Sequence, residues 1–130
     1  MTSQTTGHFS IGTHMAGAVT FTCALTLSGG RAVGMGAVTQ AINPPLDIDT
    51  YLSGTVANIV WGADVTQVIA LTGHAYRTPM PPNPENVECT MQLDSRNPAK
   101  CTASLSYLED GVWHTLENLP VQVKWQYAPD

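Results

Sequence analysis

Two aspartates form the pair of side chains in this sequence best placed to hold a cation. Asp47 and Asp49 are one residue apart, so a β-strand would carry both carboxylates on the same face. Calcium sites in proteins need a longer loop of oxygen ligands, and no such loop surrounds this pair. The spacing therefore predicts a polar entrance to a strand, and no metal site.

Imidazole groups are the next candidates, because they bind metals and transfer protons near neutral pH. The four histidines lie in four separate segments, without a His-x-His or His-x-x-x-His pattern. This spacing predicts ordinary surface or half-buried histidines and leaves open a site assembled in space from separate strands. The histidines are His8, His14, His74 and His114.

Motifs for nucleophilic catalysis and for cofactor binding are absent from the sequence. It contains neither a G-x-S-x-G nor an S-x-x-K pattern. Gly34 and Gly36 lack the third glycine and the following helix of a dinucleotide-binding fingerprint, so they indicate a bulge or a close approach by another backbone. We therefore predict no cofactor and favour a protein without catalytic activity.

The charge balance limits the partners of the chain. Its formal net charge is −5, and its five basic residues are scattered, so neither nucleic acid nor an anionic membrane surface is an expected partner. No stretch is long and apolar enough for a membrane-spanning helix, and the first residues do not resemble a secretory signal. The expected compartment is the cytoplasm, with signal-independent export left open.

Alternating apolar and polar residues predict that the chain is built from strands. From Val19 to Leu27 the odd positions are apolar and the even positions are mostly threonine. Similar runs recur along all 130 residues, which predicts one all-β domain with a flexible tail at residues 1–6. We expect an antiparallel β-sandwich or barrel of eight to nine strands with little or no helix.

Several turns and pairings are also predicted. Asp110-Gly111 indicates a two-residue hairpin of the type I′ class, and residues 118–120 are expected to break the last run. A hairpin that opposes Met91 to Cys101 keeps the apolar residues of both strands on one side. Three cysteines occupy the apolar phase of strands, which predicts buried, reduced thiols. They are Cys23, Cys89 and Cys101.

One stretch carries a family resemblance. Residues 36–47, which read GAVTQAINPPLD, followed by Gly54, resemble the most distinctive part of a family of short proteobacterial proteins known only as a domain of unknown function. The resemblance implies a bacterial accessory protein of β type. It assigns no catalytic residue.

The expected function is that of a binding or self-assembling protein, with a protein partner or a second copy as a homodimer. A small-molecule or sugar ligand is an alternative, the latter through exposed aromatics such as Trp113, and a small hydrolase or isomerase is another. In an antiparallel fold alternate loops share one end, and long loops often carry binding residues. That loop end predicts a site at His14, Asn43, Asp47, Arg77, Glu85 and Asp110.

Overall fold

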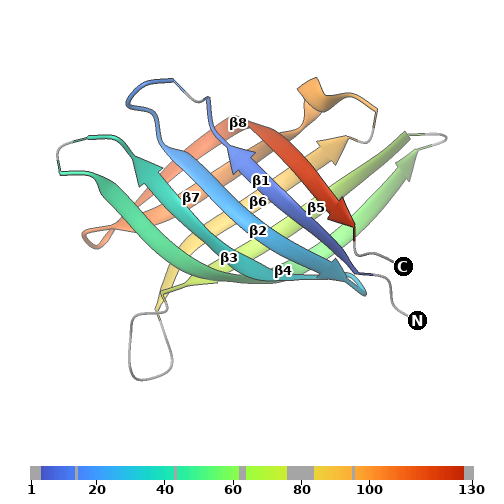
Figure 1. Ribbon diagram of the computed structural model, residues 1–130, viewed down its shortest axis with the longest axis horizontal. Helices are drawn as coiled ribbons and strands as arrows, with labels where there is room; N and C mark the ends of the chain where they lie inside the picture. Colours follow the sequence, from blue (N-terminus) through green and yellow to red (C-terminus); the bar gives the residue numbers. More distant parts are fainter. Residues whose placement is uncertain are drawn as a thin grey trace.

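The computed structural model shows a closed barrel of eight antiparallel strands (Figure 1). It describes residues 4–13, 15–42, 44–61, 64–75, 84–94 and 96–127. A three-residue 3₁₀ turn, η1 (Pro98–Lys100), precedes the seventh strand. The strands are β1 (Thr5–Ile11), β2 (Thr20–Ser28), β3 (Arg31–Gln40), β4 (Leu46–Trp61), β5 (Asp64–His74), β6 (Glu85–Asp94), β7 (Thr102–Glu109) and β8 (Val112–Tyr127).

Each strand pairs with its neighbours in the chain, and the pairing of β1 with β8 closes the barrel. This ladder runs from Thr5 opposite Tyr127 to Ile11 opposite Val121. The all-β prediction is confirmed, with a barrel rather than a sandwich. Closure also gives every described strand a neighbour on both sides, which removes most of the open edge through which strands can pair between molecules.

Two details of the predicted strands are wrong. Residues 118–120 do not break the chain, because β8 continues through them with Asn118 at a φ of 56° and a shift of register opposite β7. Such a bulge bends a strand and accommodates a proline that cannot donate to the ladder. Met91 pairs with Ala103 instead of Cys101, a difference of two residues that keeps the same face inward.

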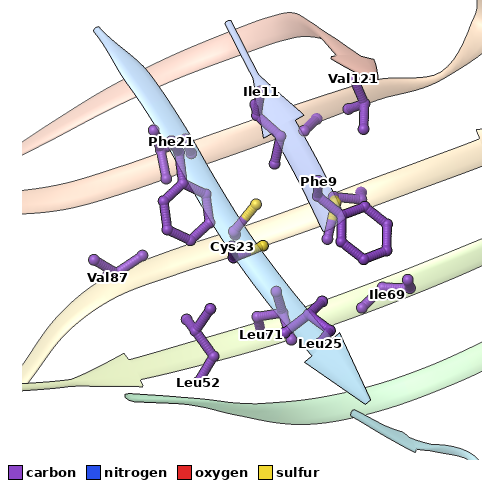
Figure 2. Close-up of a cluster of buried hydrophobic side chains, with 14 of the residues drawn as sticks. Phe9, Ile11, Phe21, Cys23, Leu25, Leu52, Ile69, Leu71, Val87 and Val121 are labelled. Atoms are coloured by element: carbon purple, nitrogen blue, oxygen red, sulfur yellow. The ribbon is translucent and has the colours of Figure 1, made fainter. Parts of the chain in front are cut away.

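The interior of the barrel is packed with apolar side chains from all eight strands (Figure 2). Phe9 and Phe21 project inward from β1 and β2 towards Ile69 and Leu71 of β5 and Val87 of β6. An eight-stranded barrel is only wide enough for its inward side chains or for one small ligand. The largest fully buried side chains are Phe9, Phe21, Ile11, Leu25, Ile69, Met91, Leu105, Val38, Val87, Thr50 and Cys89.

Two inward-facing glycines allow neighbouring strands to approach closely. A Cβ atom on Gly34 would overlap the carbonyl oxygen of Ala24, and one on Gly54 would overlap that of Ala70. The pairing of β2 with β3 is regular around Gly34, so the close approach expected from the sequence is present and a bulge is not. These positions let the wall curl where a side chain would hold the strands apart.

Replacing Gly54 with alanine tests this constraint. We expect Gly54→Ala to lower the free energy of unfolding by about 3 kcal/mol or more, because backbone must move to make room for the methyl group. Gly111→Ala is the control, since that glycine has a φ of 79° and open space around it. Its cost should be about 1–2 kcal/mol from backbone strain alone. Urea unfolding measures both, and equal losses would contradict the argument.

All three cysteines are free and buried, as predicted. Burial raises the pKa of Cys89 from 9.0 to about 12. Burial raises the pKa of Cys23 even further, and the nearby Cys89 adds to this effect. Thiolates are the reactive form of cysteine, so these two side chains are inert at neutral pH.

Stability should therefore fall in alkaline solution. The unfolded chain loses its thiol protons near pH 9 while the folded chain keeps them, so the stabilisation is complete below pH 9 and is lost as pH rises towards about 12. Each thiol should contribute a slope of about 1.4 kcal/mol per pH unit in this window. The Cys23→Ala/Cys89→Ala variant should have a flatter profile in urea unfolding at successive pH values. An unchanged slope would count against buried, protonated thiols.

Candidate functional site

The connections between strands divide between the two ends of the barrel. One end, the loop end, carries the connections before β2, β4, β6 and β8 (Figure 1). The other end, the mouth, is formed where β1 begins and β8 ends, and includes the connections before β3, β5 and β7. Alternate connections thus share an end, as strand parity predicts.

Three of the six predicted binding residues lie outside the described residues: His14, Asn43 and Arg77. The other three are at the loop end. Asp47 is exposed near the start of β4, Glu85 begins β6, and Asp110 has a φ of 51° in the turn before β8. Asp110 thereby takes the backbone conformation that the type I′ turn requires. A binding role for these residues stays a prediction.

A buried polar pair lies at the loop end of the interior. Thr50 Oγ1 donates to Asn86 Oδ1 over 2.7 Å, and Asn86 Nδ2 donates to the carbonyl of Asp49 over 3.1 Å. The strand between them contributes Gly73, where a Cβ would collide with the Thr50 hydroxyl. A register shift beside Gly73 brings Asn86 inward next to Val87. This pair links β4 to β6 across β5 and supports the loop end.

The hairpin of β7 and β8 brings a histidine and a carboxylate together at the loop end. His114 Nε2 lies 3.5 Å from Glu109 Oε1, and the His114 ring stacks on Tyr107 with 5.2 Å between centroids. Burial raises the pKa of Tyr107, and the nearby Glu109 adds to this effect. The side chains of His114 and Glu109 are 43% and 34% exposed, so water screens their attraction.

The mouth, opposite the loop end, contains a hollow of about 740 Å³. Residues of β4, β5, β6 and β8, most of them at inward positions, line it, and η1 forms part of its rim. Most of these side chains are apolar, and Asp94 is the charged one among them. The hollow is lined by Asn58, Val65, Gln67, Leu93, Asp94, Pro98, Ala99, Cys101, Pro120, Val121, Gln122, Val123 and Trp125.

Two carboxamides occupy inward positions in this hollow. Asn58 and Gln67 are directly opposite each other on β4 and β5. Asn58 is on the same face of β4 as Leu52, and Gln67 is on the same face of β5 as Ile69; Leu52 and Ile69 are buried in the core deeper in the barrel. Within the described residues neither side-chain amide makes a hydrogen bond. Both amides can therefore offer a donor and an acceptor to a molecule in the hollow.

Local hydrogen bonds hold the rim of the hollow in place. The Asp94 carboxylate accepts from the backbone N–H groups of Arg96 and Asn97, over 2.8 and 3.0 Å, and these bonds lower the pKa of Asp94. The Asn97 side chain caps η1 by accepting from the N–H of Ala99 over 3.1 Å. Asp94 thus serves the loop structure, which leaves the amides as the uncommitted polar groups of the mouth.

The wall contributed by β8 includes an aromatic side chain. Trp125 packs edge-to-face against Phe9, with 5.5 Å between ring centroids and an interplanar angle of 84°. Phe9 is almost completely buried, so the indole is supported from the core side.

The described residues contain no group of three His, Cys, Asp or Glu side chains that could hold a metal ion. The arrangement is suited to binding by shape, apolar contact and hydrogen bonds.

Comparison with known proteins gives a family for this barrel. A family model described as a domain of unknown function, DUF1842, matches residues 6–113. The chain belongs to the DUF1842 family. The resemblance of residues 36–47 to a domain of unknown function is thereby confirmed, and the DUF1842 match extends from β1 into the first residues of β8. No curated protein matches the chain.

The DUF1842 match includes part of the mouth. Asn58, Gln67 and η1 lie inside the matched residues, whereas Val123 and Trp125 lie beyond them. The sequence marks Asn58 and Gln67 in one way: each is a polar residue at a position of the strand where the alternation calls for an apolar, inward one.

No described helix of this DUF1842 protein is long and apolar enough to cross a membrane.

Two substitutions compare a polar side chain that is hydrogen-bonded within the protein, Thr50, with one that is not, Gln67. Thr50→Val removes a donor from the buried Asn86 oxygen and should cost about 1–3 kcal/mol of unfolding free energy. Gln67→Leu removes no side-chain hydrogen bond within the described residues, and it should lower the free energy of unfolding by less than about 0.5 kcal/mol, or raise it. Chemical denaturation of both variants measures the difference. A large loss in Gln67→Leu would show that this amide supports the fold.

Proposed function

We propose that this DUF1842 protein is a non-enzymatic binding protein that holds a small, mostly apolar molecule in the mouth of its barrel. The observation that supports this most directly is the pair of inward amides, Asn58 and Gln67, at the hollow. A polar group at an inward position gains a hydrogen bond when a suitable ligand enters. A ligand carrying one or two hydrogen-bonding groups would match the pair.

The size and lining of the hollow support this proposal. A volume of about 740 Å³ is within the range of about 300–1,000 Å³ that ligand pockets occupy. Such pockets are mainly apolar with a few placed polar groups, as here. The capped η1 and the supported Trp125 limit the freedom of the walls, which reduces the cost of ordering them on binding.

The packed core restricts the shape of the ligand. Leu25, Ile69 and Met91 are fully buried deeper in the barrel, so the ligand would occupy the mouth and not the length of the barrel. A compact ring system fits this depth better than a long acyl chain. Asp94 brings a negative charge to the lining and the chain is acidic overall, which disfavours an anionic ligand.

Two alternatives from the sequence find less support at the mouth. A sugar-binding module would stack its ligand on several exposed aromatics, and Trp125 is the one aromatic side chain in the lining. A hydrolase would need a base beside a nucleophile. The lining includes no histidine, and its carboxylate, Asp94, accepts hydrogen bonds from the backbone N–H groups of Arg96 and Asn97. We therefore favour binding over catalysis as the function of this hollow.

Fluorescence titration with Prodan, a neutral naphthalene dye with one carbonyl acceptor, tests the proposal. We expect a saturable blue shift of the dye emission with the wild-type protein. Ala99→Trp places a bulky ring at the hollow and should abolish the shift. The matched control Ala57→Trp adds the same ring to the exposed outer face of β4, next to Asn58, and should bind the dye normally.

The amides give a second readout in the same titration. Hydrogen bonds to the dye carbonyl shift its emission to the red, so the Asn58→Leu/Gln67→Leu variant should bind the dye with bluer emission than the wild type. Dye binding that survives Ala99→Trp would refute the mouth as the site. Identical emission from the amide variant would show that these two side chains do not contact the dye.

A further inference from the structure

The outer wall of β3 and β4 carries an exposed apolar cluster in the middle of the barrel. Met35 and Tyr51 are directly opposite each other and are 49% and 47% exposed, and the adjacent Val33 is 50% exposed. Ala24 on β2 pairs with Met35 and extends the cluster. We call these four residues the wall cluster. Among the described residues, the other large exposed apolar side chains lie at strand ends or in connections; they are Met15, Ile42, Ile59, Val60, Val112 and Trp113.

Opposite charges flank the wall cluster at equal distances. Arg31 is four residues before Met35 on β3, and Asp47 is four residues before Tyr51 on the antiparallel β4. Each charge therefore lies roughly 13 Å along the wall from the Met35–Tyr51 pair, in opposite directions. Both side chains are exposed and project from the outer face.

We propose that this wall binds a second copy of the chain, with a twofold axis that crosses the strands at Met35 and Tyr51. This rotation lays the wall cluster of one protomer on that of its partner. It also exchanges the two charged ends, so Arg31 of each protomer lies opposite Thr39 of the other. Asp47 of that protomer pairs with Thr39, so the two opposite charges are one strand spacing, about 5 Å, apart along the wall. An axis parallel to the strands would instead place like charges together, which costs several kcal/mol at protein interfaces.

The neighbouring positions agree with the same axis. Ser53 pairs with Val33, and Asp49 pairs with Ala37, two residues on either side of the central pair. The rotation brings Val33 onto Ala37 of the other protomer and Ser53 onto Asp49. Apolar residues thus face apolar residues, and a hydroxyl faces a carboxylate, over the whole central segment of the wall.

Charge reversal with sedimentation velocity tests this dimer. We expect the wild type to form dimers as its concentration rises. Arg31→Glu and Asp47→Lys should each weaken dimerisation about tenfold or more, because every reversal places like charges together twice. The Arg31→Glu/Asp47→Lys variant should recover the wild-type dissociation constant to within about threefold, because opposite charges meet again.

Two further variants complete the test. Met35→Glu should give monomers, whereas Val112→Glu, at a similarly exposed residue of the β7–β8 hairpin, should dimerise as the wild type does. Far-ultraviolet circular dichroism checks that each variant is folded. A wild type that stays monomeric at about millimolar concentration overturns the proposal. So does a dimer that tolerates the single reversals, or a double variant that does not recover.

Discussion

The narrow interior of an eight-stranded barrel is the constraint on which the other features of this protein depend. Its width admits little more than its own inward side chains, so large inward residues must be balanced by small ones. Phe9 and Phe21 fill much of the interior. Gly34 and Gly54 have no side chain, which allows neighbouring strands to approach closely and the wall to curl. The thiols of Cys23 and Cys89 fill small gaps between larger groups and lose their reactivity by being enclosed.

The same constraint explains why the two ends of the barrel differ. At the loop end Gly73 leaves room for Thr50 to reach Asn86 across a strand, so polar groups there are satisfied within the protein. At the mouth the inward positions of β4 and β5 are taken by Asn58 and Gln67, which line a hollow. The first arrangement stabilises the fold, and the second leaves hydrogen-bonding capacity for another molecule.

Local patterns were sufficient to predict most strands and turns. Alternation identifies the faces of β2 and β6, and Asp110-Gly111 adopts the backbone that its residue types favour. Register is harder, because a shift of two residues keeps every side chain on its face, as with Met91 opposite Ala103. Whether the sheet forms a sandwich or a barrel depends on whether the first and last strands pair. Local sequence patterns do not predict that pairing.

The candidate site shows a similar division. The length of the connections predicted a site at the loop end, where Asp47, Glu85 and Asp110 do lie. The hollow at the mouth depends instead on residues from five segments brought together by closure, and its signal is two polar residues at inward positions. Strand phase would have marked Asn58 and Gln67 once β4 and β5 were aligned. That alignment is part of the tertiary structure, and the sequence pattern alone does not give it.

The ladder between β1 and β8 also has a consequence for how the chain folds. Seven of the eight pairings join strands that follow each other, and such hairpins form quickly because their loops are short. The last pairing joins Ile11 to Val121, and closing a loop of that length costs about 4 kcal/mol of chain entropy. Until it forms, β1 and β8 both expose unpaired backbone, so the half-closed sheet is the species most prone to aggregate during folding.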